Sequence, residues 1–183
     1  IFIKTVARRG YRFIARVEKV DVQPSTGASP ASSPGARDTS SLEAYRAVME
    51  GSLRLESLDV GELPRAIADF ERAASIDPRY ALAFAGLASA ELALYETTRS
   101  DNQPRTDLLT SAVGHARHAV DLDQSLAEAH ATLALVLVSR WETAEAGAAA
   151  RRAVSIEPSN WRHLFRLGHA TWGEERLRAG ASM

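Results

Sequence analysis

Cysteine is absent from the 183 residues of this chain, which excludes disulfide bonds and thiolate metal ligands. No apolar run approaches the roughly 18 residues of a membrane span, and the N-terminal residues lack the apolar core and cleavage site of a signal peptide. The sequence also lacks a Gly-rich phosphate loop and the common motifs of zinc proteases and serine hydrolases. These absences predict a cytoplasmic protein that is not an enzyme and that holds no cofactor or metal.

Lysine is missing after Lys19, and charge is distributed unevenly along the chain. Residues 1–20 hold six basic side chains and one acidic side chain, although the whole chain has a net charge of −1. A basic segment on an acidic body predicts that only the first segment meets a polyanion.

Residues 1–17 have the pattern of a β-hairpin. Side chains of two kinds alternate over residues 1–6 and again over residues 11–16, which is the period of a β-strand. Gly10 lies between the two segments, where a short turn favours a residue that tolerates positive φ. Because a hairpin alone is marginal in water, this one either packs on a part that is missing here or is a remnant.

The motifs Thr5-Val6, Arg8-Arg9 and Gly10-Tyr11-Arg12-Phe13 closely resemble the closing hairpin, or wing, of OmpR-type winged-helix DNA-binding domains. The chain also starts with Ile1 rather than Met. We therefore expect a fragment that begins inside a winged helix, with residues 1–19 as its C-terminal hairpin.

This resemblance implies contacts with promoter DNA. Arg8 and Arg9 at the turn are the first candidates to meet phosphates or the minor groove, and Lys4 and Arg12 are the next. Such contacts supply salt-dependent affinity, whereas the bases would be read by a recognition helix that is not in this chain.

Residues 20–40 separate the hairpin from the rest of the chain. Twelve of the residues 21–40 are Pro, Gly, Ser or Thr, and little in the segment is apolar enough to bury. This composition predicts a flexible, disordered linker.

From Ser41 onward, alanine recurs at fixed helical intervals before an acidic residue and proline. Steps of 4, 3 and 5 positions separate Ala66, Phe70, Ala73 and Pro78, then Ala112, Ala116, Ala119 and Gln124, and then Ala146, Ala150, Ala153 and Pro158. Gln124 and Pro158 are 34 positions apart, which is the period of tetratricopeptide (TPR) repeats. Pro78 and Gln124 are 46 apart, with the additional residues in the polar stretch 97–106.

The repeats predict a mainly α protein, in which a TPR-like α-solenoid of about three and a half helix pairs spans residues 41–183. The expected helices are 42–56, 62–76, 80–96, 107–122, 125–140, 142–156 and 160–172. Only residues 174–183 remain to pair with the last helix, and they are too short, so we expect truncation at this end too. Wing, linker and repeats together resemble CadC-like transcriptional regulators, in which the winged helix binds promoter DNA and the repeats serve as a sensory or protein-binding module.

Small residues are expected to let the paired helices approach closely. They are Gly51, Ala88, Ala134 and Gly168 on the first helices, and Ala66, Ala112 and Ala146 on the second helices. The three tryptophans, Trp141, Trp161 and Trp172, are expected to pack in the core or between repeats, and for Trp161 a hydrophobic patch exposed by truncation is the alternative. His115 and His118 lie one helical turn apart, but without a third ligand nearby we interpret them as ordinary helix residues.

First-helix positions that line the concave face of a TPR stack form the candidate binding groove. The predicted groove residues are Leu82, Ser89 and Leu92, then Glu128, Leu135 and Val138, and then Phe165 and His169. TPR domains that clamp a peptide carboxylate use Lys, Arg and Asn here, and the first two sets lack these residues. We therefore expect an apolar partner surface, or packing on further repeats or on the linker.

The sequence as a whole predicts a fragment of a DNA-binding transcriptional regulator with an unknown protein or signal at its repeats. Two alternatives remain open. One is a TPR protein-interaction scaffold without DNA binding. The other is the regulatory array of a larger signalling enzyme, which a catalytic domain beyond Met183 would support.

Overall fold

The computed structural model describes the backbone of residues 3–6, 10–13, 39, 41–57 and 59–181, and the side chains of residues 39, 41–57 and 59–171. The chain divides into two compact units, Ile1–Ser32 and Ser33–Met183. The predicted linker lies outside the described residues, apart from Thr39.

In the first unit, strands β1 (Ile3–Val6) and β2 (Gly10–Phe13) pair antiparallel, with Thr5 opposite Tyr11. That this hairpin belongs to a winged helix stays a prediction.

The second unit is built from helices. Its described part contains α1 (Leu42–Glu56), the short 3₁₀ turn η1 (Val60–Glu62), α2 (Leu63–Ile76), α3 (Ala81–Thr98), α4 (Thr106–Leu122), α5 (Ala127–Ser139), α6 (Thr143–Ile156) and α7 (Trp161–Ala181). The seven predicted helices are confirmed, and six of them have bounds within about two residues of those expected from the sequence.

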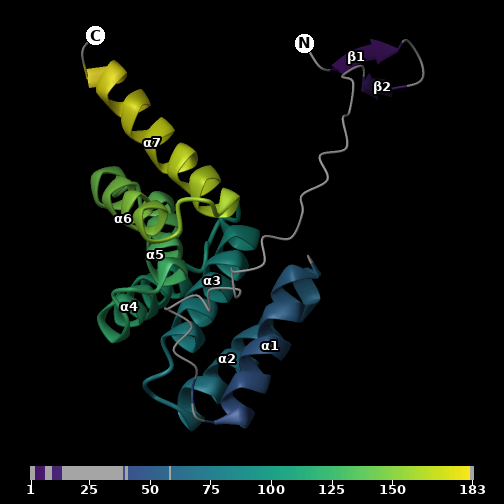
Figure 1. Ribbon diagram of the computed structural model, residues 1–183, viewed down its shortest axis with the longest axis vertical. Coiled ribbons are helices and arrows are strands. Elements are labelled where there is room, and N and C mark those ends of the chain that lie inside the picture. Colours follow the sequence, from purple (N-terminus) through teal and green to yellow (C-terminus); the bar gives the residue numbers. More distant parts are fainter. Residues whose placement is uncertain (1–2, 7–9, 14–38, 40, 58, 182–183) are drawn as a thin grey trace, which may run out of the picture. The chain divides into compact units, whose positions relative to one another are not determined.

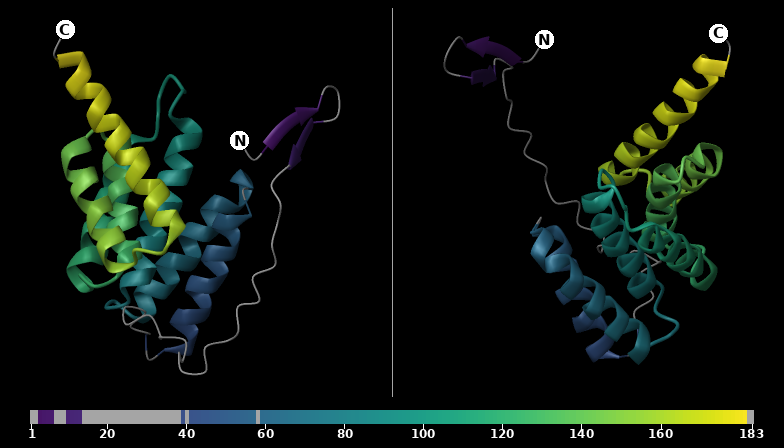
Figure 2. Two further views of the ribbon diagram at one scale, coloured as in Figure 1. Left: turned by 45° about the horizontal axis from the view of Figure 1, so that its top comes forward. Right: turned by 180° about the vertical axis from the view of Figure 1, so that it is seen from behind.

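The helices form antiparallel pairs that stack side by side (Figures 1 and 2). Pairs α1–α2, α3–α4 and α5–α6 each contact the next pair, and α7 packs against α6. The first helices α1, α3, α5 and α7 also contact one another in that order and so form one continuous layer. The described helices therefore have the stacked-pair architecture that the 34-residue period predicts.

Alanine makes the close packing between the two layers. Ala66, Ala112 and Ala146 on the second helices are fully buried, because a methyl side chain lets two helix backbones approach closely. Ala116 and Ala150 occupy equivalent positions on α4 and α6, whereas α2 has the much larger Phe70 at this position. The Phe70 ring packs against Gly51 of α1 and Gly86 of α3.

Asx side chains organise the turns between pairs. The Asp77 carboxylate accepts the Arg79 N–H at 3.0 Å, and the Asp123 carboxylate accepts the Ser125 N–H at 2.8 Å. A hydrogen bond from the Thr39 hydroxyl, together with the Arg79 N–H, holds the pKa of Asp77 below its ordinary value. These bonds end one helix pair and begin the next.

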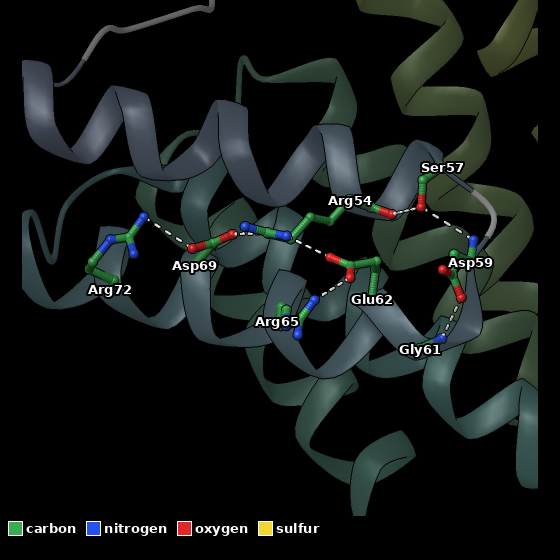
Figure 3. A network of polar contacts seen from close by, with 8 residues as sticks. All are labelled: Arg54, Ser57, Asp59, Gly61, Glu62, Arg65, Asp69 and Arg72. Atoms are coloured by element: carbon green, nitrogen blue, oxygen red, sulfur yellow. Dashed lines mark hydrogen bonds and ion pairs between the residues drawn. The ribbon is translucent and has the colours of Figure 1, made fainter.

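A polar network fixes the first pair (Figure 3). Arg54 of α1 donates to the buried Asp69 of α2 at 2.8 Å and to Glu62 at 2.5 Å. Asp69 also pairs with Arg72 at 3.0 Å, and Glu62 pairs with Arg65. The hydrogen bond from Arg54 holds the pKa of Glu62 below its ordinary value.

Three expectations differ from the structure. Helix α7 continues to Ala181 rather than ending near residue 172, and its C-terminal part extends beyond α5 and α6 (Figures 1 and 2). Trp141 and Trp161 are 68% and 69% exposed, so the packing role expected for Trp141 is wrong, and the exposure of Trp161 agrees with the alternative of an exposed patch. Gly168 is exposed and has no atom within 4 Å of the position that a Cβ would occupy, because no described helix covers this side of α7.

Candidate protein-interaction face

The predicted groove residues lie on three neighbouring helices. We call the surface of Leu82, Ser89, Leu92, Glu128, Leu135, Val138, Phe165 and His169 the first-helix face. Its residues belong to α3, α5 and α7, which contact each other in that order. The fold thus places the three contributing helices side by side, and the binding role of the eight residues stays a prediction.

On α3, the three predicted residues are half-buried. Leu82 and Leu92 pack partly against buried core clusters, so only part of each side chain is accessible. The hydroxyls of Ser89 and Thr132 are 3.2 Å apart, and this hydrogen bond joins α3 to α5. These residues therefore combine packing between repeats with some exposed surface.

On α5, Leu135 and Val138 are half-buried, and Val138 packs against the core. Arg166 of α7 donates to the Glu128 carboxylate at 2.9 Å. Near the other end of α5, the Ser139 hydroxyl donates to Glu96 of α3 at 2.7 Å. Polar contacts thus connect α5 to both of its neighbours and leave the two apolar side chains between them.

On α7, the two predicted residues are exposed. Phe165 is 70% exposed, which is high for a phenylalanine, and His169 is also accessible. One turn before Phe165, Arg162 lies 3.7 Å from Glu56 at the end of α1. This ion pair joins the first and last helices of the layer, although both side chains are largely exposed and the pair is weak.

Sequence reasoning missed an apolar stripe on α1. Leu42, Tyr45, Met49 and Leu53 recur at steps of 3, 4 and 4 positions and are 63%, 42%, 38% and 71% exposed. The spacing was a usable signal, but a stripe of this kind looks the same in sequence whether it is buried or open.

The hairpin residues are placed only by their backbone. Lys4 and Arg12 are register partners across β1 and β2. Arg8 and Arg9 lie outside the described residues.

His115, His118 and His163 have structural partners. His115 Nδ1 lies 2.8 Å from the buried Glu91 carboxylate, and His118 packs edge-on against Phe84. His163 is buried beside Glu157 at 3.1 Å. Across the part of the chain that the structure describes, no group of three His, Asp or Glu side chains could hold a metal ion.

A shallow hollow of about 370 Å³ lies where the turns after α2 and α4 meet. Arg79, Asp121 and Asp123 line it together with apolar residues that include Leu82. The opposite charges on its rim give it no single preference for a ligand. None of the helices described above is long and apolar enough to cross a membrane.

No protein-family model matches the chain, and no curated protein matches it. Solved structures do. The TPR protein TTC0263 of Thermus thermophilus is 20% identical with a TM-score of 0.65, and the match covers 75% of this chain and 68% of that one. The Sgt2 TPR domain of Aspergillus fumigatus is 19% identical with a TM-score of 0.62, covering 77% and 85% of the two chains.

A third similar structure is the first TPR of Spaghetti (RPAP3) bound to the HSP90 peptide SRMEEVD. It is 18% identical with a TM-score of 0.58, and the match covers 73% of this chain and 96% of that one. Likeness at this level of identity establishes the fold, so the helical unit is a TPR-type α-solenoid. None of these three structures is a winged-helix protein, and the resemblance of the N-terminal hairpin is not tested by them.

Proposed function

We propose that the repeat unit binds a protein segment of apolar character on the first-helix face. The observation that carries this proposal is the 70% exposure of Phe165 on α7, together with the partly accessible Leu135 and Val138 on the neighbouring α5 and Leu92 on α3, the next helix of the same layer. Large apolar side chains gathered on one surface favour a protein partner.

The charges on this face argue against an acidic peptide terminus. The RPAP3 domain is bound to a peptide ending in EEVD. Here the predicted positions of α3 and α5 include no Lys, Arg or Asn, and Glu96 and Glu128 add negative charge. Of the two arginines near this face on α7, Arg166 is paired with Glu128, and Arg162 lies 3.7 Å from Glu56. An apolar helix or extended segment therefore suits the face better than a carboxylate.

Selection from a phage-displayed library of random 15-residue peptides, followed by calorimetry with the best binder, tests the proposal. Phe165→Ala should weaken binding at least about tenfold, because an exposed aromatic side chain commonly carries much of the binding energy of such an interface. Val60→Ala is the matched control, since Val60 is also exposed but lies in η1, and it should bind within about twofold of the native chain. The peptide SRMEEVD should not bind at about 1 mM. Binding that survives both Phe165→Ala and Leu135→Ala, or tight binding of SRMEEVD, would contradict the proposal.

We further propose that the protein to which this chain belongs is a DNA-binding transcriptional regulator. The motif Arg8-Arg9-Gly10-Tyr11-Arg12-Phe13 and the six basic side chains of residues 1–20 support it. In this arrangement the repeats would recruit a partner to the promoter, because the composition of residues 21–40 predicts a linker that transmits proximity rather than rigid motion.

Reading the DNA upstream of the Ile1 codon is the first test. A frame that continues into a helix–turn–helix pattern supports the regulator, whereas a stop codon or an unrelated domain contradicts it. In a protein with the complete winged helix, Arg8→Ala and Arg9→Ala should each weaken binding to all DNA sequences alike. Each substitution should reduce, by about one, the slope of the logarithm of the DNA-binding constant plotted against the logarithm of the salt concentration. Unchanged slopes would show that these arginines do not contact DNA.

A further inference from the structure

The outer helices of the first-helix layer, α1 and α7, meet through their side chains. Arg162 at the start of α7 lies 3.7 Å from the Glu56 carboxylate at the end of α1. Helices α3 and α5 lie between them, each in contact with the next. Packed helices are about 8–10 Å apart, so a flat layer would separate α1 from α7 by about 24–30 Å, beyond the reach of these side chains. The layer is therefore curled, and its outer helices approach each other where α1 ends and α7 begins (Figures 1 and 2).

Both residues of this pair occupy positions of the first-helix face. Arg162 lies 34 positions, one repeat period, after Glu128 of that face. Glu56 directly follows Leu55, which is the counterpart of Leu92 on α3, since both leucines lie four positions after the small residue at which paired helices meet. The layer therefore curls toward the side of the first-helix face.

The pair consequently crosses over the first-helix face. Its two ends are on α1 and α7, and Leu92, Leu135 and Val138 lie on the two helices between them. Phe165 is one turn after Arg162 on the same side of α7. A segment that lies on these apolar side chains takes the space that the two charged side chains cross.

We propose that the Glu56–Arg162 pair is a strap across the first-helix face, which is formed in the free protein and breaks when a segment binds there. This inference rests on the binding role of the face proposed above. The side chains of Glu56 and Arg162 are 65% and 59% exposed, so the pair stabilises the closed arrangement only weakly. Arg162 also lies 5.9 Å from the centre of the Trp161 ring, a contact that the guanidinium keeps after the strap breaks. The strap therefore lowers the affinity of the face for its partner by about two- to fivefold.

Salt dependence distinguishes the strap from ordinary apolar binding. The Debye length falls from about 10 Å in about 0.1 M salt to about 3 Å in about 1 M salt, so salt weakens an exposed ion pair. The affinity of the face for an uncharged segment should then rise with salt. Neutralising one residue of the strap should remove this part of the rise and leave only the general effect of salt on apolar contacts.

Opening of the strap is measured first without a partner. The chain has no cysteine, so Leu53→Cys and Trp161→Cys, at exposed residues beside the strap, provide the only thiols for two spin labels. The native pair should hold the labels at one short distance in electron paramagnetic resonance at low salt. Glu56→Gln should broaden the distribution toward longer distances, and the exchange Glu56→Arg with Arg162→Glu should restore it. A distribution that Glu56→Gln leaves unchanged overturns the proposal.

The effect on binding is measured by calorimetry with a selected peptide that contains no charged residue. At low salt, Glu56→Gln should bind this peptide about two- to fivefold more tightly than the native chain does. Glu50→Gln is the matched control, because it breaks an exposed pair between α1 and Arg72 of α2 that does not cross the face. This control should keep the native affinity and salt dependence. Equal affinities of Glu56→Gln and the native chain at low salt overturn the proposal.

Failure of the strap and failure of the partner-binding proposal give different results. If the strap is wrong, Phe165→Ala still weakens peptide binding, whereas Glu56→Gln changes neither the label distances nor the affinity. If the first-helix face binds no peptide in any variant at any salt concentration, the partner-binding proposal is wrong, and the strap loses its role even where the label distances respond. Circular dichroism of each variant confirms that the helices remain folded.

Discussion

The ring of Phe70 lies directly against Gly86. A Cβ built on Gly86 would be 2.5 Å from Cδ1 of that ring, which is shorter than the contacts that real Cβ atoms make. Since Phe70 is 1% exposed and packed on Gly51 on another side, its ring has little room to move. This contact sets the distance between the first and second helix pairs.

Gly86→Ala should therefore destabilise the fold, although alanine usually stabilises a helix. Overpacking of this kind lowers the free energy of unfolding by about 1–3 kcal/mol. Gly114→Ala is the matched control: Gly114 is also inside a helix but has open space at its Cβ position, so this change should raise the free energy by about 0.5–1 kcal/mol. Urea unfolding followed by circular dichroism measures both, and two changes of the same sign would contradict the packing argument.

The α5–α6 turn contains a residue with a strained backbone. Trp141 has φ of 63°, in the left-handed region that favours glycine. Its N–H bonds to the Val138 carbonyl and the Glu142 N–H bonds to the Leu137 carbonyl, which is the Schellman ending of a helix.

Trp141→Gly should raise the free energy of unfolding by about 1 kcal/mol, because glycine adopts this conformation without a steric penalty. The exposed indole contributes little burial that could be lost. Trp141→Ala removes the same ring but keeps a Cβ at positive φ, so it should gain much less. Equal stability of the Gly and Ala variants, compared by thermal unfolding, would rule out backbone strain as the cause.

Acid should weaken the α1–α2 connection. The hydrogen bond from Arg54 lowers the pKa of Glu62 below the ordinary value of 4.5. A group whose pKa is depressed by folding stabilises the fold above its unfolded pKa, and this contribution is lost as pH falls through the folded value. The native chain should therefore lose stability below about pH 4.5 more steeply than Glu62→Gln. Arg54→Met removes the cause and should flatten the curve as well, whereas a Glu62→Gln curve parallel to the native one would contradict this origin.

The repeat period predicted most of the fold, namely the helices and their stacking in pairs. Helix pairs of fixed length require small residues at fixed intervals, and these intervals can be read from the sequence at Ala66–Ala73 and Ala146–Ala153. The repeat period did not predict which apolar helix faces remain exposed to solvent. A stripe such as Tyr45 and Met49 has the same spacing whether a neighbour covers it or not, and coverage depends on contacts between distant segments. The exposure of Trp141 was mispredicted for the same reason, since aromatic character indicates burial only where another element covers the side chain.

The pairing of Glu91 with His115 was also invisible in sequence, because the two residues are 24 positions apart and meet only when α3 packs on α4. The Glu91 side chain is 8% exposed, and His115 is its partner in the described structure, 2.8 Å away. His115→Ala should lower the free energy of unfolding by about 1–3 kcal/mol, because it leaves a buried carboxylate without that hydrogen bond. Adding Glu91→Leu to this variant removes the buried charge and should recover part of the loss. If the double variant is no more stable than His115→Ala in urea unfolding, the loss comes from packing of the imidazole against Phe84 rather than from the unpaired carboxylate.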